Sequence, residues 1–100
     1  MDRVVIESER ETDAGWIFTC RITSASGTDR KIDLGLSWPD YDLWAPDGSV
    51  PPERVAAAVL TLLLEHEENP DRQRLDAAQL RRIIPGSDDV LRHRVKSTRI

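Results

Sequence analysis

Two histidines and one cysteine are the side chains best suited to acid–base, metal or nucleophilic chemistry in this sequence. His66 follows an apolar stretch and stands between Glu65 and Glu67, whereas His93 lies in a distant, basic segment. On a helix the two neighbouring glutamates point away from His66, and no second histidine lies four residues from it, so a metal site lacks its ligands. We therefore interpret His66 as a partly buried, hydrogen-bonded structural residue rather than a general base or a metal ligand.

Cys20 and three aspartates are the other candidates, and each has a structural interpretation. Cys20 lies among apolar residues in a predicted strand, with no cation or helix N-terminus to lower the pKa of its thiol, so we expect it to be buried and inert. Asp40, Asp42 and Asp47 could bind a hard cation, but a calcium loop needs an oxygen ligand where Trp44 stands. Turn formation and capping explain the same aspartates, and the sequence has no phosphate-binding glycine loop, nucleophile elbow or paired-cysteine motif. We predict no metal and no cofactor, and an enzymatic activity is not favoured.

An aromatic and acidic segment over residues 38–49 connects the predicted strands to the predicted main helix. Three of the chain's five aromatic residues lie within seven positions of it, and prolines at 39 and 46 stiffen both ends, which lowers the entropy lost on binding. Exposed aromatic residues are preferred anchors of interfaces, so we expect at least one of the three to be exposed, in a patch rimmed by Asp40 and Asp42. The alternative is that all three fill the end of the core. The candidate partner-binding residues are Trp38, Asp40, Tyr41, Asp42 and Trp44.

The charges are divided unevenly, with a net charge of −9 over residues 1–71 and +5 over residues 72–100. The basic part could contact phosphates, and its two short predicted helices loosely resemble a helix-turn-helix. However, the chain is acidic overall, and the basic part could instead fold back onto the carboxylates of Glu65, Glu67 and Glu68. Nucleic-acid binding is therefore the alternative function. Its candidate residues are Arg81, Arg82, Arg92, Arg94 and Lys96.

Hydrophobic periodicity predicts the elements that must position these groups. Alternation predicts strands over residues 3–9, 15–23 and 31–37, and the short turns between them indicate an antiparallel meander with one buried face. A helical turn should begin after Ser37 and end at Trp44. Three strands need a cover to be stable, and the main helix is the obvious one.

The main helix is predicted over residues 52–68, where Pro52 suits the first turn. A polar linker should follow over residues 69–74. Asp76 and Gln79 then match a capping box that begins a short helix over residues 77–84. The positions expected to face the strands are Val55, Val59, Leu62 and Leu63. The apolar positions of the short helix are Ala77, Leu80, Ile83 and Ile84, and those of a last helix capped by Ser87 are Val90, Leu91 and Val95.

Length and composition are typical of one soluble domain, since 39% of the 100 residues are hydrophobic and 32% are charged. The first ten residues are charged, and the longest apolar run, residues 55–64, is too short to span a bilayer. We therefore expect a cytoplasmic protein with no membrane partner. The expected organisation is a single domain over 1–100, with strands in 1–37, the connecting segment in 38–49, the main helix in 52–68 and two short helices in 76–96.

Three segments, LGLSWPDYDLW, VPPERVAAAVLTLLLEHE and LDAAQLRRIIPGSDD, together resemble a group of small uncharacterised bacterial proteins with a strand–strand–helix–helix plan. The resemblance covers residues 15–92 and implies an α+β fold and a bacterial origin, but no activity, cofactor or functional residue. Our prediction for the fold is α+β, with a three-stranded antiparallel meander packed on a central helix and followed by two short helices. The predicted function is a non-catalytic protein-interaction or regulatory module, which could also self-associate.

Overall fold

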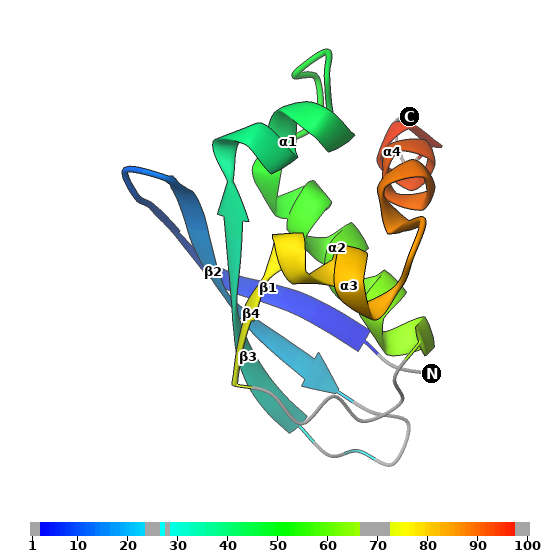
Figure 1. Ribbon diagram of the computed structural model, residues 1–100. Helices are drawn as coiled ribbons and strands as arrows, with labels where there is room; N and C mark the ends of the chain where they lie inside the picture. The colour runs from blue at the N-terminus through cyan, green and yellow to red at the C-terminus, as the bar shows by residue number, and fades with distance from the viewer. Residues whose placement is uncertain (1–2, 24–26, 28, 67–72, 98–100) are drawn as a thin grey trace.

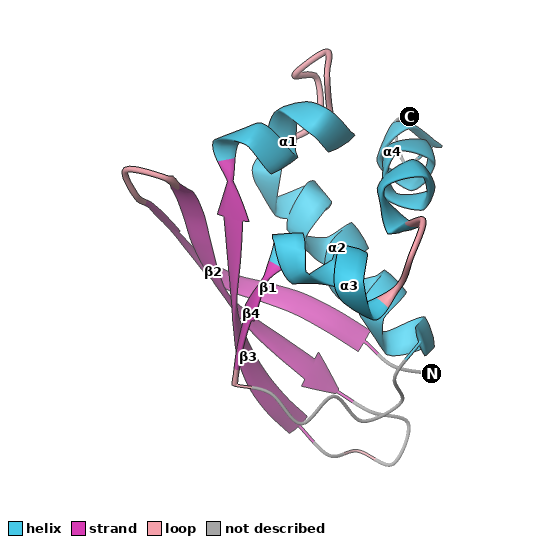
Figure 2. Ribbon diagram, in the orientation of Figure 1, coloured by secondary structure: helices cyan, strands magenta, loops and turns pink. Residues whose placement is uncertain are grey.

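The computed structural model of the chain describes residues 3–23, 27, 29–66 and 73–97. A four-stranded sheet forms one layer, and the described helices all lie against one of its faces (Figures 1 and 2). The strands are adjacent in the order β1-β2-β3-β4. Their bounds are β1 (Arg3–Glu11), β2 (Gly15–Thr23), β3 (Asp29–Ser37) and β4 (Arg74–Asp76). The fold is therefore α+β, as predicted, and β1, β2 and β3 are antiparallel neighbours, as predicted.

The fourth strand corrects the sequence interpretation, which ended a polar linker at residue 74 and placed no strand there. β4 pairs with β3 in parallel, so that Leu75 lies beside Leu34, and both side chains are buried. Just before it, the Asp33 N–H donates to the Gln73 carbonyl over 2.9 Å. A three-residue strand contains one apolar position, which is too few for any periodicity to be detected.

The alternation of β2 determines which face of the sheet is covered. Trp16, Phe18, Cys20 and Ile22 are all buried, whereas the residues between them are half-buried or exposed. β1 is an edge strand, and its register with β2 shifts at a bulge between Ile6 and Ser8. A bulge and a high density of charged residues are two ways in which edge strands avoid pairing with other chains.

The main helix covers this face at the predicted positions. Its core-facing residues Val55, Val59, Leu62 and Leu63 are buried in one cluster with the strands, which confirms their placement. His66, however, is exposed, so the prediction of a partly buried histidine is wrong. Helical periodicity gives the direction of a side chain, but not whether another element extends far enough to cover it. The helices are α1 (Trp38–Trp44), α2 (Pro52–His66), η1 (Ala77–Gln79, a 3₁₀ turn), α3 (Leu80–Ile83) and α4 (Ser87–Ser97).

The cap predicted at Asp76 is found in the structure, whereas the cap predicted at Ser87 is not, because the Ser87 hydroxyl is buried and has no hydrogen-bond partner among the described residues. Asp76 and Gln79 form the predicted capping box: the Ala78 N–H donates to the Asp76 carboxylate over 2.9 Å, and the Asp76 N–H donates to the Gln79 side chain over 3.0 Å. The helix predicted over residues 77–84 is divided into η1 and α3. Gly86, with φ of 84°, adopts the left-handed conformation that lets the chain turn from α3 into α4.

The apolar positions of these helices are only partly buried. Ala77, Leu80, Leu91 and Val95 are buried, as predicted. The prediction is wrong at three positions: Ile83 and Ile84 are half-buried, and Val90 is 37% exposed. These helices are short, so they present only a narrow face to α2 and the sheet. Among the described helices, none is both long and apolar enough to cross a membrane.

Candidate functional site

α1 connects the sheet to the main helix, and its two sides differ sharply. Ser37 caps it, accepting the Asp40 N–H over 3.3 Å, so the predicted helical turn is confirmed. Positions four apart share a side of a helix. Trp38 and Asp42 therefore lie together on one side and are exposed, whereas Asp40 and Trp44 lie together on the other side and are buried. The segment predicted as one binding surface is thus divided between solvent and core.

The buried side of α1 is held by two residues from α3 and α4. The Arg81 guanidinium donates to Asp40 Oδ1 over 2.5 Å, and its Nε lies 3.0 and 2.9 Å from the two oxygens of Asp88. The Trp44 indole N–H also donates to Asp88, over 2.9 Å, and the guanidinium carbon lies 5.5 Å from the centre of the Trp44 ring. We call Asp40, Trp44, Arg81 and Asp88 the Arg81 network. The expectation that Asp40 rims an exposed patch is wrong, because Arg81 draws its carboxylate inward and leaves it 7% exposed.

Hydrogen bonds within the network determine the pKa shifts of Asp88 and Arg81. Burial alone would raise the pKa of Asp88, but the hydrogen bonds from Arg81 and Trp44 outweigh it, so the pKa of Asp88 is lowered. Hydrogen bonds to Asp40, and then to Asp88, raise the pKa of Arg81. Asp88 and Arg81 therefore stay charged near neutral pH, and the hydrogen bonds of the network join α1 to α3 and α4.

The basic residues proposed for nucleic acid are mostly engaged within the protein. Besides Arg81, Arg94 forms a two-pronged pair with Glu65 over 2.6 and 2.7 Å, and the Arg92 Nε donates to the Leu43 carbonyl over 3.3 Å. The pair between Arg94 and Glu65 confirms that the basic part folds back onto the acidic part, while Glu67 and Glu68 lie outside the described residues. Arg82 and Lys96 are exposed. The structure therefore does not gather the five cations into one free basic surface.

The exposed side of α1 completes an aromatic cluster. Trp38 is 42% exposed, and its ring centre lies 4.3 Å from that of Trp16 on β2. Tyr41, half-buried, lies 5.3 Å from Trp16 and donates its hydroxyl to the Val50 carbonyl over 2.5 Å. The Trp38 N–H donates to the Ala14 carbonyl over 3.0 Å, which anchors the start of α1 to the turn between β1 and β2.

Three exposed carboxylates lie on α1 and on β1, the strand that pairs with β2. Glu9 and Glu11 on β1 are the direct cross-strand partners of Phe18 and Trp16, and directly opposed side chains share a face of a sheet. Both glutamates are exposed, as is Asp42, one helical turn after Trp38. Burial raises the pKa of Tyr41, and the charges of Asp42 and Asp47 raise it further. We call Trp16, Trp38, Tyr41, Asp42, Glu9 and Glu11 the Trp38 face.

Sequence reasoning missed half of the Trp38 face. Alternation over residues 15–23 places Trp16 on the same side of its strand as Cys20, but it does not show that this strand end lies under α1. Glu9 and Glu11 are not among the residues that the sequence predicts for a binding site. The available signal was the cross-strand register, which follows from the short turn over residues 12–14 and places Glu11 opposite Trp16.

Cys20 is a core residue of β2. Its thiol is buried and lies 3.7 Å from the Phe18 carbonyl. Burial is the main cause that raises its pKa to about 12, with smaller contributions from Asp33 and Glu7. The predicted burial of Cys20 is confirmed, and a thiol that stays protonated is a poor nucleophile.

Comparisons with known proteins do not add a function to this geometry. No family model matches the chain, and neither the curated proteins nor the solved structures gave a match. The class defined so far is an α+β domain with an aromatic, acid-rimmed face at the junction of its sheet and its helices.

Proposed function

We propose that this protein is a non-catalytic protein-interaction module that binds a cationic segment of a partner protein on the Trp38 face. The single observation that carries the proposal is the exposure of Trp38, 42%, on a helix that buries its other tryptophan to 1%. Val5 and Val90 are the other large apolar residues exposed in the described part of the chain, and neither is an aromatic residue. Large exposed aromatic residues with a polar rim are typical of interaction sites.

The chemistry of the face favours a positively charged ligand. A cation over an indole gains about 0.5–2 kcal/mol, and tryptophan is the best ring for this contact. Glu9, Glu11 and Asp42 add negative charge at the edge of the cluster, which attracts cations and repels acidic partners. In the partner segment, arginine suits this face better than lysine, because its planar guanidinium can stack on the Trp38 ring while its N–H groups reach a carboxylate.

The face is also preorganised. Trp38 is fixed through its backbone to Ala14 and through its ring to Trp16, and Tyr41 is fixed through its hydroxyl to Val50. A rigid site loses little entropy on binding, so a small surface can still bind usefully.

Nucleic-acid binding remains the alternative, and the geometry supports it less. Arg81 and Arg94 are paired with Asp88 and Glu65, and Arg92 uses its Nε for the Leu43 carbonyl, which leaves Arg82, Lys96 and the terminal amino groups of Arg92 as its candidates. So few cations predict weak binding with a shallow salt dependence. Bacterial origin, cytoplasmic location and the resemblance to small bacterial proteins also stay predictions.

The proposal is tested by NMR titration of the protein with the peptide acetyl-Gly-Arg-Gly-Arg-Gly-amide. We expect saturable shifts in the Trp38 indole N–H and in the amides of α1, which weaken as salt is added. A peptide with citrulline in place of arginine keeps the shape without the charge and should not bind. Equal binding of the two peptides would reject a cation-specific face.

A matched pair of variants tests the acidic rim. Asp42 and Asp89 are both exposed helical aspartates, but only Asp42 adjoins Trp38. Asp42→Asn should weaken peptide binding severalfold, and Asp89→Asn should leave it unchanged. Sedimentation velocity of the protein alone tests self-association. If the protein associates as its concentration rises, and Trp38→Ala removes this association, a second copy supplies the basic segment.

A further inference from the structure

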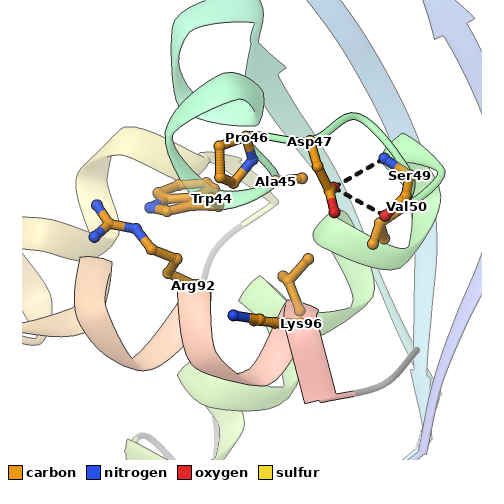
Figure 3. A pocket seen from close by; sticks show the side chains of 9 residues that line it. Trp44, Ala45, Pro46, Asp47, Ser49, Val50, Arg92 and Lys96 are labelled. Atoms are coloured by element: carbon orange, nitrogen blue, oxygen red, sulfur yellow. Dashed lines mark hydrogen bonds between the residues drawn. The ribbon is translucent and has the colours of Figure 1, made fainter. Parts of the chain in front are cut away.

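A second concave site lies on the opposite side of α1 from the Trp38 face, between α4 and the loop over residues 45–50 (Figure 3). Its volume is about 270 Å³, near the lower end of small-molecule pockets, about 300–1,000 Å³. The inner surface is apolar, because Trp44, Ala45, Val50 and Val95 line the pocket and are otherwise buried. Pro46 stiffens the loop that forms its outer wall.

Two cations line the same pocket. Arg92 and Lys96 lie four residues apart on α4, so they are neighbours on one side of the helix. Arg92 uses its Nε for the Leu43 carbonyl, over 3.3 Å, and its two terminal amino groups have no hydrogen-bond partner among the described residues. Lys96 is exposed and has no ion pair within the described part of the chain.

Asp47 is the one carboxylate among the described residues that line the pocket, and its single negative charge leaves the two cations in excess. Asp47 accepts hydrogen bonds from the Ser49 N–H and hydroxyl, over 3.0 and 2.8 Å, which shape the loop. Figure 3 shows Asp47 beside Val50, while the Lys96 amine points away from it toward the side where Arg92 lies. The pocket is therefore polarised, with a cationic end and an apolar interior.

We propose that this pocket binds a small organic anion, a free molecule with one carboxylate on an unbranched or aromatic body of several carbons. The carboxylate would lie between Arg92 and Lys96, and the body would lie against Trp44 and Val50. A charge-assisted hydrogen bond is about twice as strong as a neutral one, and the apolar body adds about 0.8 kcal/mol for each CH₂ it buries. This site is independent of the proposed function, because it shares no residue with the Trp38 face.

Octanoate is the probe for the test, with 1-octanol as its neutral analogue. In an NMR titration, octanoate should shift the amides of Ala45, Val50 and Val95 in a saturable way, and octanol should bind at least five times more weakly. Equal binding of the two probes, or shifts located elsewhere, would overturn the proposal.

Lys96→Gln is the decisive variant, since it keeps most of the side-chain length and removes the charge. It should weaken octanoate binding about fivefold to tenfold, whereas Arg82→Gln, on an exposed cation outside the pocket, should have no effect. Unfolding curves check that both variants fold. If Lys96→Gln does not fold, Arg92→Gln, which removes the other positive charge of the pocket, should weaken octanoate binding in the same way. Octanoate binding that neither Lys96→Gln nor salt weakens would contradict the assignment.

A last arm distinguishes the source of the carboxylate. The tripeptide acetyl-Gly-Gly-Leu with a free C-terminus presents the same chemistry on a peptide. If it binds more tightly than octanoate at the same amides, the pocket recognises a protein C-terminus and the assignment to a free molecule is wrong.

Discussion

The two sides of α1 carry the same residue types at the same spacing and have opposite environments. Trp38 and Asp42 lie four residues apart and face solvent, whereas Asp40 and Trp44 lie four residues apart and face the core. Helix propensity and composition do not distinguish these pairs. The difference comes from Arg81 and Asp88, which lie about forty residues further along the chain and satisfy the polar atoms of one pair only.

The comparison shows how an aromatic–acidic segment can be both core and surface. A buried carboxylate and a buried indole N–H are costly unless each has a partner, so the inward side requires the Arg81 network. The outward side has no such requirement, because water solvates Asp42. What remains there is an exposed indole that no described side chain covers completely, and that excess of apolar surface supports a recognition role.

The largest difference is expected when the two tryptophans are truncated in turn. Trp44→Ala removes a fully buried ring and an indole hydrogen bond, so it should lower the free energy of unfolding by about 3–5 kcal/mol. Trp38→Ala removes one half-exposed aromatic contact and should cost about 1 kcal/mol. Urea unfolding of both variants measures this, and equal losses would mean that the two sides of α1 do not differ as described.

The next largest effect is expected at Arg81, the cation that pairs with the buried side of α1. Arg81→Ala leaves the carboxylates of Asp40 and Asp88 without their partner, and should cost about 1–3 kcal/mol, because the partial exposure of Arg81 lets solvent screen the loss. Its neighbour Arg82 is exposed, so Arg82→Ala should change the free energy of unfolding by less than about 0.5 kcal/mol. A similar effect of both changes would show that the network does not stabilise α1.

A smaller effect follows from the lowered pKa of Asp88. Burial opposes its ionisation, but Arg81 and Trp44 overcome it, so the folded-state pKa lies below the ordinary value of 3.8. The stabilisation from this carboxylate is therefore fully present above pH 3.8 and is lost as the pH falls through the folded-state pKa.

Asp88→Asn isolates that contribution. The stability difference between the protein and this variant should be constant at neutral pH and should shrink as the pH falls below about 4. Glu65 and Glu7, whose pKa values are also lowered by their arginine partners, are present in both proteins and cancel in the difference. A difference that does not depend on pH would contradict an ionised Asp88 in the network.

The same contrast explains what the sequence could and could not predict. The strands of the meander, the burial of Val55 and Leu63 and the cap at Asp76 follow from local patterns, and all are found in the structure. β4 could not be predicted, because Leu75 is a single apolar residue whose partner strand lies far away in the sequence. Exposure of one aromatic residue was predicted, but not its identity, since only the position of Arg81 and Asp88 assigns Trp44 to the core.

The Trp38 face was predicted in part for the same reason. Trp38, Tyr41 and Asp42 come from one continuous segment, which sequence reasoning selected by its density of aromatic residues. Trp16 and Glu11 come from the hairpin of β1 and β2, which lies beside the α1 segment only in the folded protein. The basic residues differ in the opposite way. Their charge predicts one nucleic-acid-binding surface, but Arg94 and Arg81 pair with Glu65 and Asp88 and so do not contribute to it.

The central claim is that the exposed side of α1 is for recognition and the buried side is for stability, and the most direct test is peptide affinity of Trp38→Ala. Val90→Ala is its matched control, because Val90 is 37% exposed but lies on α4 outside the Trp38 face. Titration with the arginine peptide should show binding at least tenfold weaker for Trp38→Ala and unchanged for Val90→Ala, with both variants folded. If Trp38→Ala folds and binds the peptide as tightly as the unmodified protein, the Trp38 face is not the binding surface.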